Sequence, residues 1–325
     1  MILLRRTLAL SALATGLAAP RIARAQAGDW PNRPVRIVVP SAPAGSSDTA
    51  MRALVERLTA NTGRPFFVEN RAGLAGTIGL DHVAKSPPDG YSFVFPSTNA
   101  AVNETLQPRR PIVLLRDLVP VAAVNSLPLV FAVHNGLPAQ DLRGLIEHAR
   151  ANPGDVNFAS SGPGSMFHLS TEVLAAMAGV RMTHVPFRNY SEARTQLMAG
   201  QIQLMADATF TLEPLIRGGR MRGIATSAPQ RTTTFPELPA VAELLPGYDF
   251  GLWNGLMAPA GTPRTIIERM NAEVNRVLTD PAFAEQNARM GVQLTPMTPE
   301  EFGTLIARDI DRMREAVRLA NITPE

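Results

Sequence analysis

The strongest hydrophobic pattern in the chain spans residues 35–58. Apolar side chains dominate residues 35–39, a short run that is typical of a buried strand. After a polar loop, apolar residues recur at the i, i+3, i+4, i+7 spacing of a helix with one buried face, namely Met51, Leu54, Val55 and Leu58. Gly63 then supplies a helix-ending residue. This stretch predicts a strand, a loop of small residues and an amphipathic helix.

The same order returns near the middle of the chain. Residues 156–159 form a second strand-like run, and a loop of serine and glycine follows at residues 160–165. A helix is expected next, ending at Gly179. Its expected buried side carries Met166, Leu169, Val173 and Met177. Because the two units are similar and lie far apart in sequence, we expect their loops to face each other across a cleft.

Further short apolar runs predict additional strands. They lie at residues 65–69, 91–95, 183–188, 201–207 and 222–227. Polar and apolar residues alternate in the run at 201–207, so that strand is expected to be half-buried.

Helical patterns separate these strands. They lead up to Val83, cover residues 142–151 and reach Gly200. A later helix is expected to have Thr262 as its N-cap and Pro263 as its first residue. The last helix opens with a capping box at residues 298–301. Strands that alternate with helices predict an α/β fold with mostly parallel sheets.

The chain of 325 residues is long enough for two domains. Two apolar runs, at residues 121–124 and 129–133, suggest a first crossing between domains. The apolar segment 250–259 suggests the return. We therefore predict a split first domain, residues 26–125 and 250–325, and a second domain, residues 126–249.

The first 25 residues have the pattern of a secretory signal peptide. Arg5 and Arg6 precede an apolar run over residues 8–19, and Ala23-Arg24-Ala25 fits a cleavage site. The paired arginines leave the general secretory and twin-arginine routes both open. We expect cleavage near Ala25.

Removal of this segment changes the charge of the protein. Residues 1–25 hold four arginines and no acidic side chain, which leaves 27 basic and 28 acidic residues, a net charge of −1. Without a basic surplus, nucleic acid is not an expected partner.

The two small-residue loops are candidate anion sites. A helix that follows such a loop presents unpaired N–H groups and the positive end of its dipole. Plain strand-to-helix turns of the same composition are the alternative. The candidate ligand-binding residues are Ser41, Ala42, Gly45, Ser46, Ser47 and Asp48 in the first loop, and Ser160, Ser161, Gly162, Gly164 and Ser165 in the second.

Other polar residues follow the carboxyl ends of predicted strands, where ligands bind in open α/β sheets. They are Ser97, Thr98, Asn99, Arg188 and Asp207. A guanidinium at Arg188 suits a second carboxylate, or alternatively a structural ion pair. His168, in the first turn of the second helix, is equally suited to ligand contact and to packing. Asp48 suits the start of a helix better than a ligand contact.

Enzyme and cofactor signals are weak. The chain has no cysteine and one lysine, Lys85, and it lacks G-x-S-x-G and H-E-x-x-H motifs. Glycines at residues 73–79 follow G-x-x-G-x-x-G spacing, which favours close helix–sheet packing over a dinucleotide site. We therefore expect no cofactor and no metal. A hydrolase that uses Ser165 and His168 is a low-ranking alternative.

Several segments together resemble the solute receptors of tripartite tricarboxylate transporters, the Bug family. The resemblance covers nearly all of the chain after the signal peptide, and the order and spacing of its segments are specific. The matching segments are Trp30-Pro31-Asn32-Arg33-Pro34, Val68-Glu69-Asn70-Arg71, Pro87-Pro88-Asp89-Gly90-Tyr91, Ala159-Ser160-Ser161-Gly162, His184-Val185-Pro186-Phe187-Arg188, Gly200-Gln201 and Ala258-Pro259-Ala260-Gly261-Thr262-Pro263.

The resemblance implies a two-domain periplasmic binding protein of the type II-like kind, with a hinge and a cleft between its domains. It also implies a small organic carboxylate held by both loops, partly through water, a membrane permease as partner, a periplasmic location and a monomeric state. A sensor that presents the same ligand to a kinase is the alternative function. Ser41 stands where the family usually has an aromatic residue, which leaves more room beside the ligand. Ala44 and Asn189 each stand where a glycine is usual.

Overall fold

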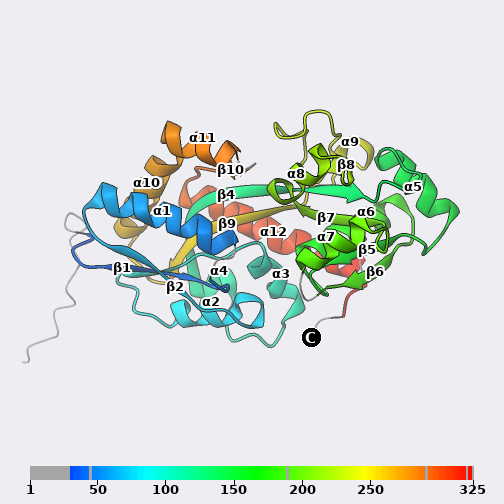
Figure 1. The fold of residues 1–325 in the computed structure, drawn as a ribbon. Coiled ribbons are helices and arrows are strands. Elements are labelled where there is room, and N and C mark those ends of the chain that lie inside the picture. Colours follow the sequence, from blue (N-terminus) through cyan, green and yellow to red (C-terminus); the bar gives the residue numbers. More distant parts are fainter. Residues whose placement is uncertain (1–29, 44–45, 188–189, 290–291, 320, 324–325) are drawn as a thin grey trace, which may run out of the picture.

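Two long strands run through the middle of the molecule and connect its two lobes (Figure 1). They are β4 (Leu118–Val133) and β9 (Gly251–Pro259), which pair antiparallel with each other. The computed structural model describes residues 30–43, 46–187, 190–289, 292–319 and 321–323. We call the part that holds β1 to β3 the first lobe and the part that holds β5 to β8 the second lobe.

The described residues form one ten-stranded sheet in the order β2-β1-β3-β9-β4-β7-β5-β6, with β8 and β10 also paired to β4. The remaining strands are β1 (Val35–Val39), β2 (Phe66–Asn70), β3 (Ser92–Val94), β5 (Asn157–Ser160), β6 (Thr183–Pro186), β7 (Leu204–Ala208), β8 (Arg222–Thr226) and β10 (Gln293–Leu294).

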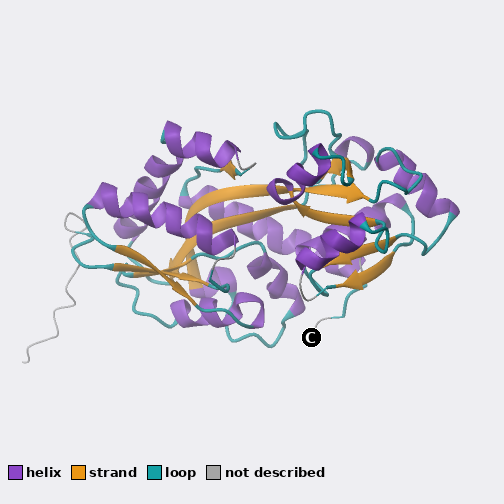
Figure 2. Ribbon diagram, in the orientation of Figure 1, coloured by secondary structure: helices purple, strands orange, loops and turns teal. Residues whose placement is uncertain are grey.

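Helices cover both faces of this sheet (Figure 2). They are α1 (Ser46–Thr62), α2 (Thr77–Ala84) with a short 3-10 turn before it (Leu74–Gly76), α3 (Asn99–Leu106), α4 (Leu114–Asp117), α5 (Leu142–Ala151), α6 (Met166–Ala178), α7 (Tyr190–Met198), α8 (Thr209–Arg217), α9 (Val241–Leu244), α10 (Arg264–Leu278), α11 (Pro281–Arg289) and α12 (Pro299–Leu319). Among the described residues, no helix is both long enough and apolar enough to cross a lipid bilayer.

The sheet as a whole is mixed, whereas the part of it within each lobe is mostly parallel, as expected. Strands within each lobe are parallel, since β1 pairs with β2 and β3, and β5 pairs with β6 and β7. The connecting strands pair antiparallel with their neighbours in both lobes. Helical crossovers give parallel pairs, whereas the chain passes between the lobes without such a crossover.

The two apolar runs at 121–124 and 129–133 belong to one strand, not two. β4 continues through Pro128, and its register against β9 shifts between Ala123 and Asn125. Its first part pairs with β9, and Leu129–Val133 pairs with β7 of the second lobe. Because of this irregularity, the strand continues through the polar segment that separates the two apolar runs.

Three further expectations need correction. β7 is buried along its whole length because β4 and β5 flank it and helices cover it. Met177 is 38% exposed, and the buried side of α6 turns toward Leu174 instead. α10 starts at Arg264, because Pro263 has a non-helical ψ of 134° and is therefore the N-cap, while the Thr262 hydroxyl donates to the carbonyl of Pro259 at 2.8 Å.

The amphipathic patterns themselves are confirmed. The four apolar residues expected to face inward on α1 are buried, and Gly63 has a φ of +65°. The capping box of α12 is formed, since Thr298 N donates to Glu301 Oε2 at 2.8 Å and Glu301 N donates to Thr298 Oγ1 at 3.2 Å.

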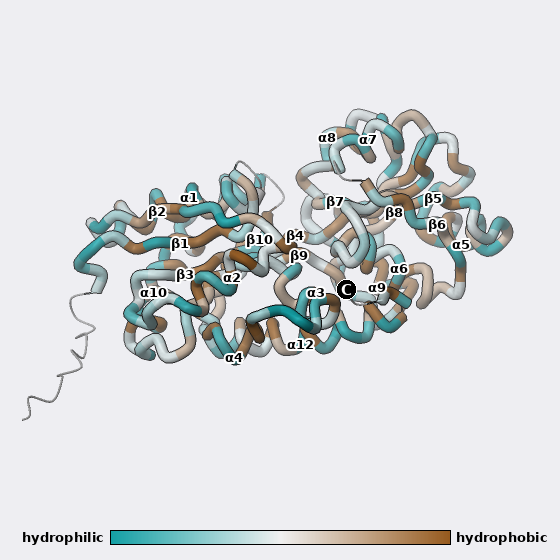
Figure 3. Tube along the Cα trace, turned by 90° about the horizontal axis from the view of Figure 1, so that it is seen from below, coloured by the Kyte–Doolittle hydropathy of each residue, from teal (hydrophilic) through white to brown (hydrophobic). Residues whose placement is uncertain are grey.

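The last helix joins the two lobes on one side. Seen from below, α12 runs past both lobes, which β4 and β9 connect (Figure 3). It packs against α3, β4 and α6. Trp253 of β9 anchors it, since the indole Nε1 donates to Asp309 Oδ2 at 2.7 Å. The side of the molecule that carries α12 is thus tied to the connecting strands.

Candidate functional site

The two small-residue loops line adjoining cavities. The first cavity, of about 290 Å³, is lined by Ser41 and Ser47 from the first loop. The second cavity, of about 390 Å³, is lined by Ser161, Gly164 and Ser165 from the second loop. Both cavities are also lined by Ala75 and Asn99, so they share a wall. The structure therefore brings the two loops to one region between the lobes.

Four helices begin at these cavities. Ser47 lies in the first turn of α1, Gly76 precedes α2, Asn99 begins α3 and Ser165 caps α6. The N-terminal end of α1 lies near the middle of the molecule (Figure 1). All described residues that line the two cavities are uncharged. The N-terminal ends of these helices at the cavities favour an anion.

The starts of α2 and α3 at this place were not foreseen from the sequence. The glycine-rich segment before α2 was interpreted as a packing feature, and that interpretation is confirmed for Gly79. A Cβ atom at Gly79 would lie 2.8 Å from Pro40 Cβ. The same close approach brings the start of α2 beside the first loop. For α3, the only sequence signal was the polar tip at 97–99.

In the first loop, the candidate residues divide between the cavity and the interior. Ser41 lines the first cavity, whereas Ala42 is exposed outside its lining. The Ser47 hydroxyl donates to Asn254 Oδ1 at 3.1 Å.

Asp48 is 2% exposed and accepts a hydrogen bond from Asn70 at 2.9 Å. Its ion pair with Arg52, at 3.0 Å, supports the helix-start role. Gly45 and the side chain of Ser46 lie outside the described residues.

The three candidate residues that follow β3 also divide between the cavity and the interior. Ser97 and Asn99 line the first cavity. Thr98 is fully buried, and its Oγ1 accepts a hydrogen bond from Trp253 N at 2.7 Å. Thr98 therefore fastens the tip to β9 and does not face the cavity.

The second loop uses several of its own polar groups internally. Ser160 is fully buried, and its Oγ accepts from Gly162 N at 3.0 Å. Gly164 N donates to His168 Nδ1 at 3.1 Å. Ser165 Oγ accepts from His168 N at 3.3 Å, as an N-cap does. The hydroxyl groups of Ser161 and Ser165 are the side-chain donors that this loop presents to the second cavity.

His168 packs beneath this loop. It is 6% exposed and stacks on His184, with ring centroids 3.8 Å apart. His184 Nε2 lies 2.5 Å from Ser160 Oγ, and Phe158 packs beside both rings, with centroids 5.2 Å from His184 and 6.1 Å from His168. Burial, together with the neighbouring His168, lowers the pKa of His184 to about 4. His184 is thus a neutral support for the loop.

This geometry disfavours the hydrolase alternative. The Nδ1 atom of His168 already accepts the Gly164 N–H, so its lone pair is occupied. Its Nε2 atom lies 3.6 Å from Glu172 Oε1. Ser165 instead contacts the backbone N–H of His168. A serine nucleophile needs a free imidazole nitrogen within hydrogen-bond reach, and these contacts do not provide one.

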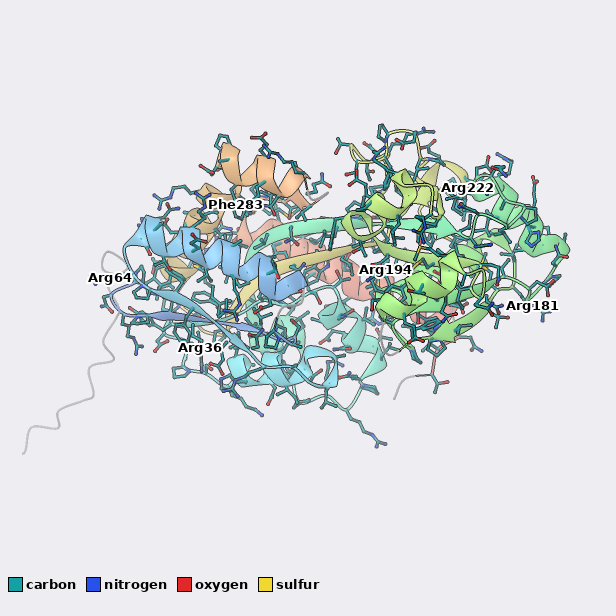
Figure 4. All side chains as sticks on the ribbon, in the orientation of Figure 1. Arg36, Arg64, Arg181, Arg194, Arg222 and Phe283 are labelled. Carbon is teal, nitrogen blue, oxygen red and sulfur yellow. The ribbon has the colours of Figure 1, made fainter. Side chains whose placement is uncertain are left out.

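Asp207 forms a buried ion pair. It is 5% exposed and lies 3.0 Å from Arg194 of α7, which Figure 4 labels in the second lobe. It also accepts from Ala208 N at 2.7 Å. Burial raises the pKa of Asp207 to about 6, against the opposing effects of these two partners. Asp207 does not line either cavity. Arg188 lies outside the described residues.

A larger cavity, of about 540 Å³, is lined by none of the predicted ligand residues. Its charged lining residue, Arg231, is paired with both oxygens of Glu243 at 2.9 and 3.0 Å. The two smaller cavities, where the helices begin, are therefore the better candidate site. Within the described residues, no group of three or more acidic or histidine side chains is placed to hold a metal ion.

Comparison with known proteins decides the family. Residues 50–322 match the family described as "Tripartite tricarboxylate transporter family receptor". The chain belongs to this family. It is 36% identical to the protein BugT of Bordetella pertussis over 306 residues, which is 93% of each chain. The resemblance inferred from the sequence is thereby confirmed.

Solved receptor structures confirm the two-domain α/β fold. The structure of Rpa4515 of R. palustris with adipate has a TM-score of 0.80 and 30% identity, covering 91% of this chain and all of that one. The structure of MatC from Rhodopseudomonas palustris with bound malate has a TM-score of 0.75 and 28% identity, covering 89% of this chain and all of that one. The tripartite tricarboxylate transporter receptors are solute-binding proteins and not an enzyme family.

Proposed function

We propose that this receptor captures a small organic carboxylate between its lobes and delivers it to a membrane permease of the tripartite tricarboxylate type. The convergence of four helix starts on two adjoining, uncharged cavities is the observation that carries this proposal. Helix ends and backbone N–H groups hold an anion without a cationic side chain.

The proposed direct contacts are the polar groups that line the cavities. They are Ser41, Ser97, Asn99, Ser161 and Ser165. Hydroxyl and amide groups bond a carboxylate directly or through an ordered water at little loss of strength. Gly45, Ser46 and Arg188 stay proposed contacts on the basis of the sequence.

A dicarboxylate suits the shape of the site best. The two cavities share Ala75 and Asn99, and each has its own serine residues. An anion with two charged ends can place one end in each cavity. Adipate and malate, the ligands of the two similar receptors, both have two carboxylates, which supports this class for the present chain.

Capture is proposed to proceed by closure of the lobes about the connecting strands. The lobe boundaries proposed from the sequence, near residues 125 and 250, fall within β4 and immediately before β9. Closure about such strands removes water from the bound anion and strengthens its contacts. We further propose that residues 1–25 direct export to the periplasm and that the receptor acts as a monomer.

Calorimetric titration tests the proposal. The chain from residue 26 onward is titrated with adipate, malate, citrate and benzoate, and with adipamide as an uncharged control. We expect heat from at least one carboxylate and none from adipamide. Silence across all four acids would overturn the proposal. Arg188→Ala is expected to weaken a dicarboxylate more than benzoate.

Delivery is tested separately in cells. Deletion of the gene is expected to abolish uptake of the radiolabelled ligand that titration identifies. Normal uptake, combined with a lost transcriptional response to the same ligand, would show a sensor instead of a transport receptor.

A further inference from the structure

Two amide side chains are buried against each other where the connecting strands pass between the lobes. Asn125 of β4 is 3% exposed and Asn254 of β9 is 5% exposed. Asn254 Nδ2 donates to Asn125 Oδ1 at 2.9 Å. The strand register shifts beside this pair, between Ala123 and Asn125. Buried amides lower stability unless they are hydrogen-bonded, so such a pair among apolar strand residues needs a physical reason.

The pair is connected to the start of α1. Ser47 Oγ donates to Asn254 Oδ1 at 3.1 Å. Ser47 lines the first cavity, whereas Asn254 and Asn125 do not. The hydroxyl hydrogen of Ser47 is used in this bond, so a bound anion cannot take it without breaking the contact. Ser47 therefore acts here as a tether more than as a ligand donor.

Asn254 also fixes the opposite wall of the first cavity. Its backbone forms an isolated antiparallel bridge with Ser97, which lines that cavity. On either side of this bridge, Thr98 N donates to Trp253 O at 3.1 Å and Gly255 N donates to Pro96 O at 3.3 Å. One residue thus holds the start of α1 through its side chain and the tip before α3 through its backbone.

We propose that Asn254 is a positioning residue for the carboxylate site. It sets the start of α1 and the tip at Ser97 at fixed positions relative to β4 and β9, without touching the ligand itself. This inference rests on the proposed function and deepens it. Asn254 is hydrogen-bonded to Asn125, which lies on the strand that enters the second lobe. A ligand that displaces the start of α1 is therefore also coupled to β4 and β9, the strands that connect the lobes.

The test replaces Asn254 by leucine, which has the same branching and number of side-chain heavy atoms but is bulkier and has no hydrogen-bonding group. Asn271→Leu is the matched control, because Asn271 of α10 is a partly buried amide that donates to Val121 O and Met297 O at 2.8 Å and lines neither cavity. Each variant is measured for amide hydrogen exchange in α1 without ligand, for affinity toward the acid that binds wild type most tightly, and for thermal midpoint.

We expect Asn254→Leu to weaken carboxylate binding at least ten-fold and to speed exchange in the first turn of α1. Asn271→Leu should lower the thermal midpoint with neither effect. Ser47→Ala should speed the same exchange. The double variant Ser47→Ala/Asn254→Leu should bind no more weakly than Asn254→Leu alone, because both substitutions remove the same hydrogen bond between Ser47 and Asn254.

Unchanged exchange and affinity in Asn254→Leu, equal losses in Asn271→Leu, or additive losses in the double variant would each overturn the inference. If Asn254→Leu does not fold, amide exchange in Ser47→Ala tests the inference instead, since this substitution removes the bond with little change in packing. The exchange measurement needs no ligand. It therefore separates failure of this inference from failure of the proposed function, which shows as absence of carboxylate binding in wild type.

Discussion

His168 and His184 lie face to face beneath the second loop, with ring centroids 3.8 Å apart and ring planes inclined by 13°. One ring accepts from Gly164 N and the other contacts Ser160 Oγ, so the pair supports both ends of the loop. Protonation of His184 would add a positive charge to this buried stack and disturb its contact with Ser160 Oγ. The loop that lines the second cavity thus depends on a neutral His184.

Stability is expected to fall in mild acid through His184. Burial lowers its pKa in the folded protein to about 4, below the ordinary value of 6.5. Above about pH 6.5 neither the folded nor the unfolded chain binds this proton, so the full stability is present. As the pH falls toward 4, the unfolded chain takes up a proton that the folded chain does not, and the free energy of unfolding decreases.

Urea unfolding between pH 4 and pH 7.5 measures this effect. The profile of His184→Gln should be flatter than that of wild type over the window from about 6.5 to about 4, and parallel to it above pH 7. The comparison cancels the other titrating groups, including Asp207, whose raised pKa acts in the opposite direction. Parallel profiles over the whole range would show that His184 does not contribute.

Gly164→Ala is expected to damage both stability and binding. The residue has a φ of +72°, and a Cβ atom there would lie 2.1 Å from Leu106 Cδ1 of α3. Left-handed backbone costs an alanine about 1 kcal/mol, and the clash with Leu106 adds to it. Gly179→Ala is the control, since Gly179 has a φ of +64° and no neighbour within 4 Å.

Chemical denaturation should therefore show a larger loss in Gly164→Ala than in Gly179→Ala. Adding Leu106→Ala to Gly164→Ala should recover carboxylate affinity, because it removes the atom that the new methyl group meets. Equal losses in the two glycine variants would contradict the clash.

Ser165→Ala is expected to act on both the helix and the ligand. Loss of the N-cap of α6 lowers stability by about 1 kcal/mol. Loss of a hydroxyl that lines the second cavity should also weaken carboxylate binding several-fold. Asp141→Ala is the matched control, because Asp141 caps α5 by accepting from Gly144 N at 2.8 Å and lines neither cavity. An affinity loss of the same size in Asp141→Ala would show that the Ser165 hydroxyl does not contact the ligand.

Asn99→Asp is expected to weaken the binding of any carboxylate strongly. Asn99 is exposed and lines both cavities, so the change places a negative charge in the shared wall with little effect on folding. A repulsion of about 1–4 kcal/mol between such charges corresponds to a loss in affinity of roughly five-fold to several hundred-fold. Asn99→Ala, which removes the amide without adding charge, should bind more tightly than Asn99→Asp. Titration of both variants distinguishes the charge from the loss of a contact.

The sequence by itself determined the local elements and the family. Apolar spacing placed α1 and α6, Gly63 and Gly179 marked their ends, and the capping box marked the start of α12. These features depend on neighbours within a few residues of each other, so a pattern along the chain contains them. The composition of the two loops, for the same reason, pointed to helix starts that suit an anion.

Only the tertiary structure decided which polar groups face the cavities. Thr98 and Asp207 looked like cavity residues in the sequence, yet they bond to Trp253 and Arg194. The starts of α2 and α3 joined the site because the lobes bring distant segments together. The direction in which a small polar side chain points is set by partners far away in the chain, and no local pattern encodes them. The continuous β4 and the antiparallel connecting strands were decided in the same way.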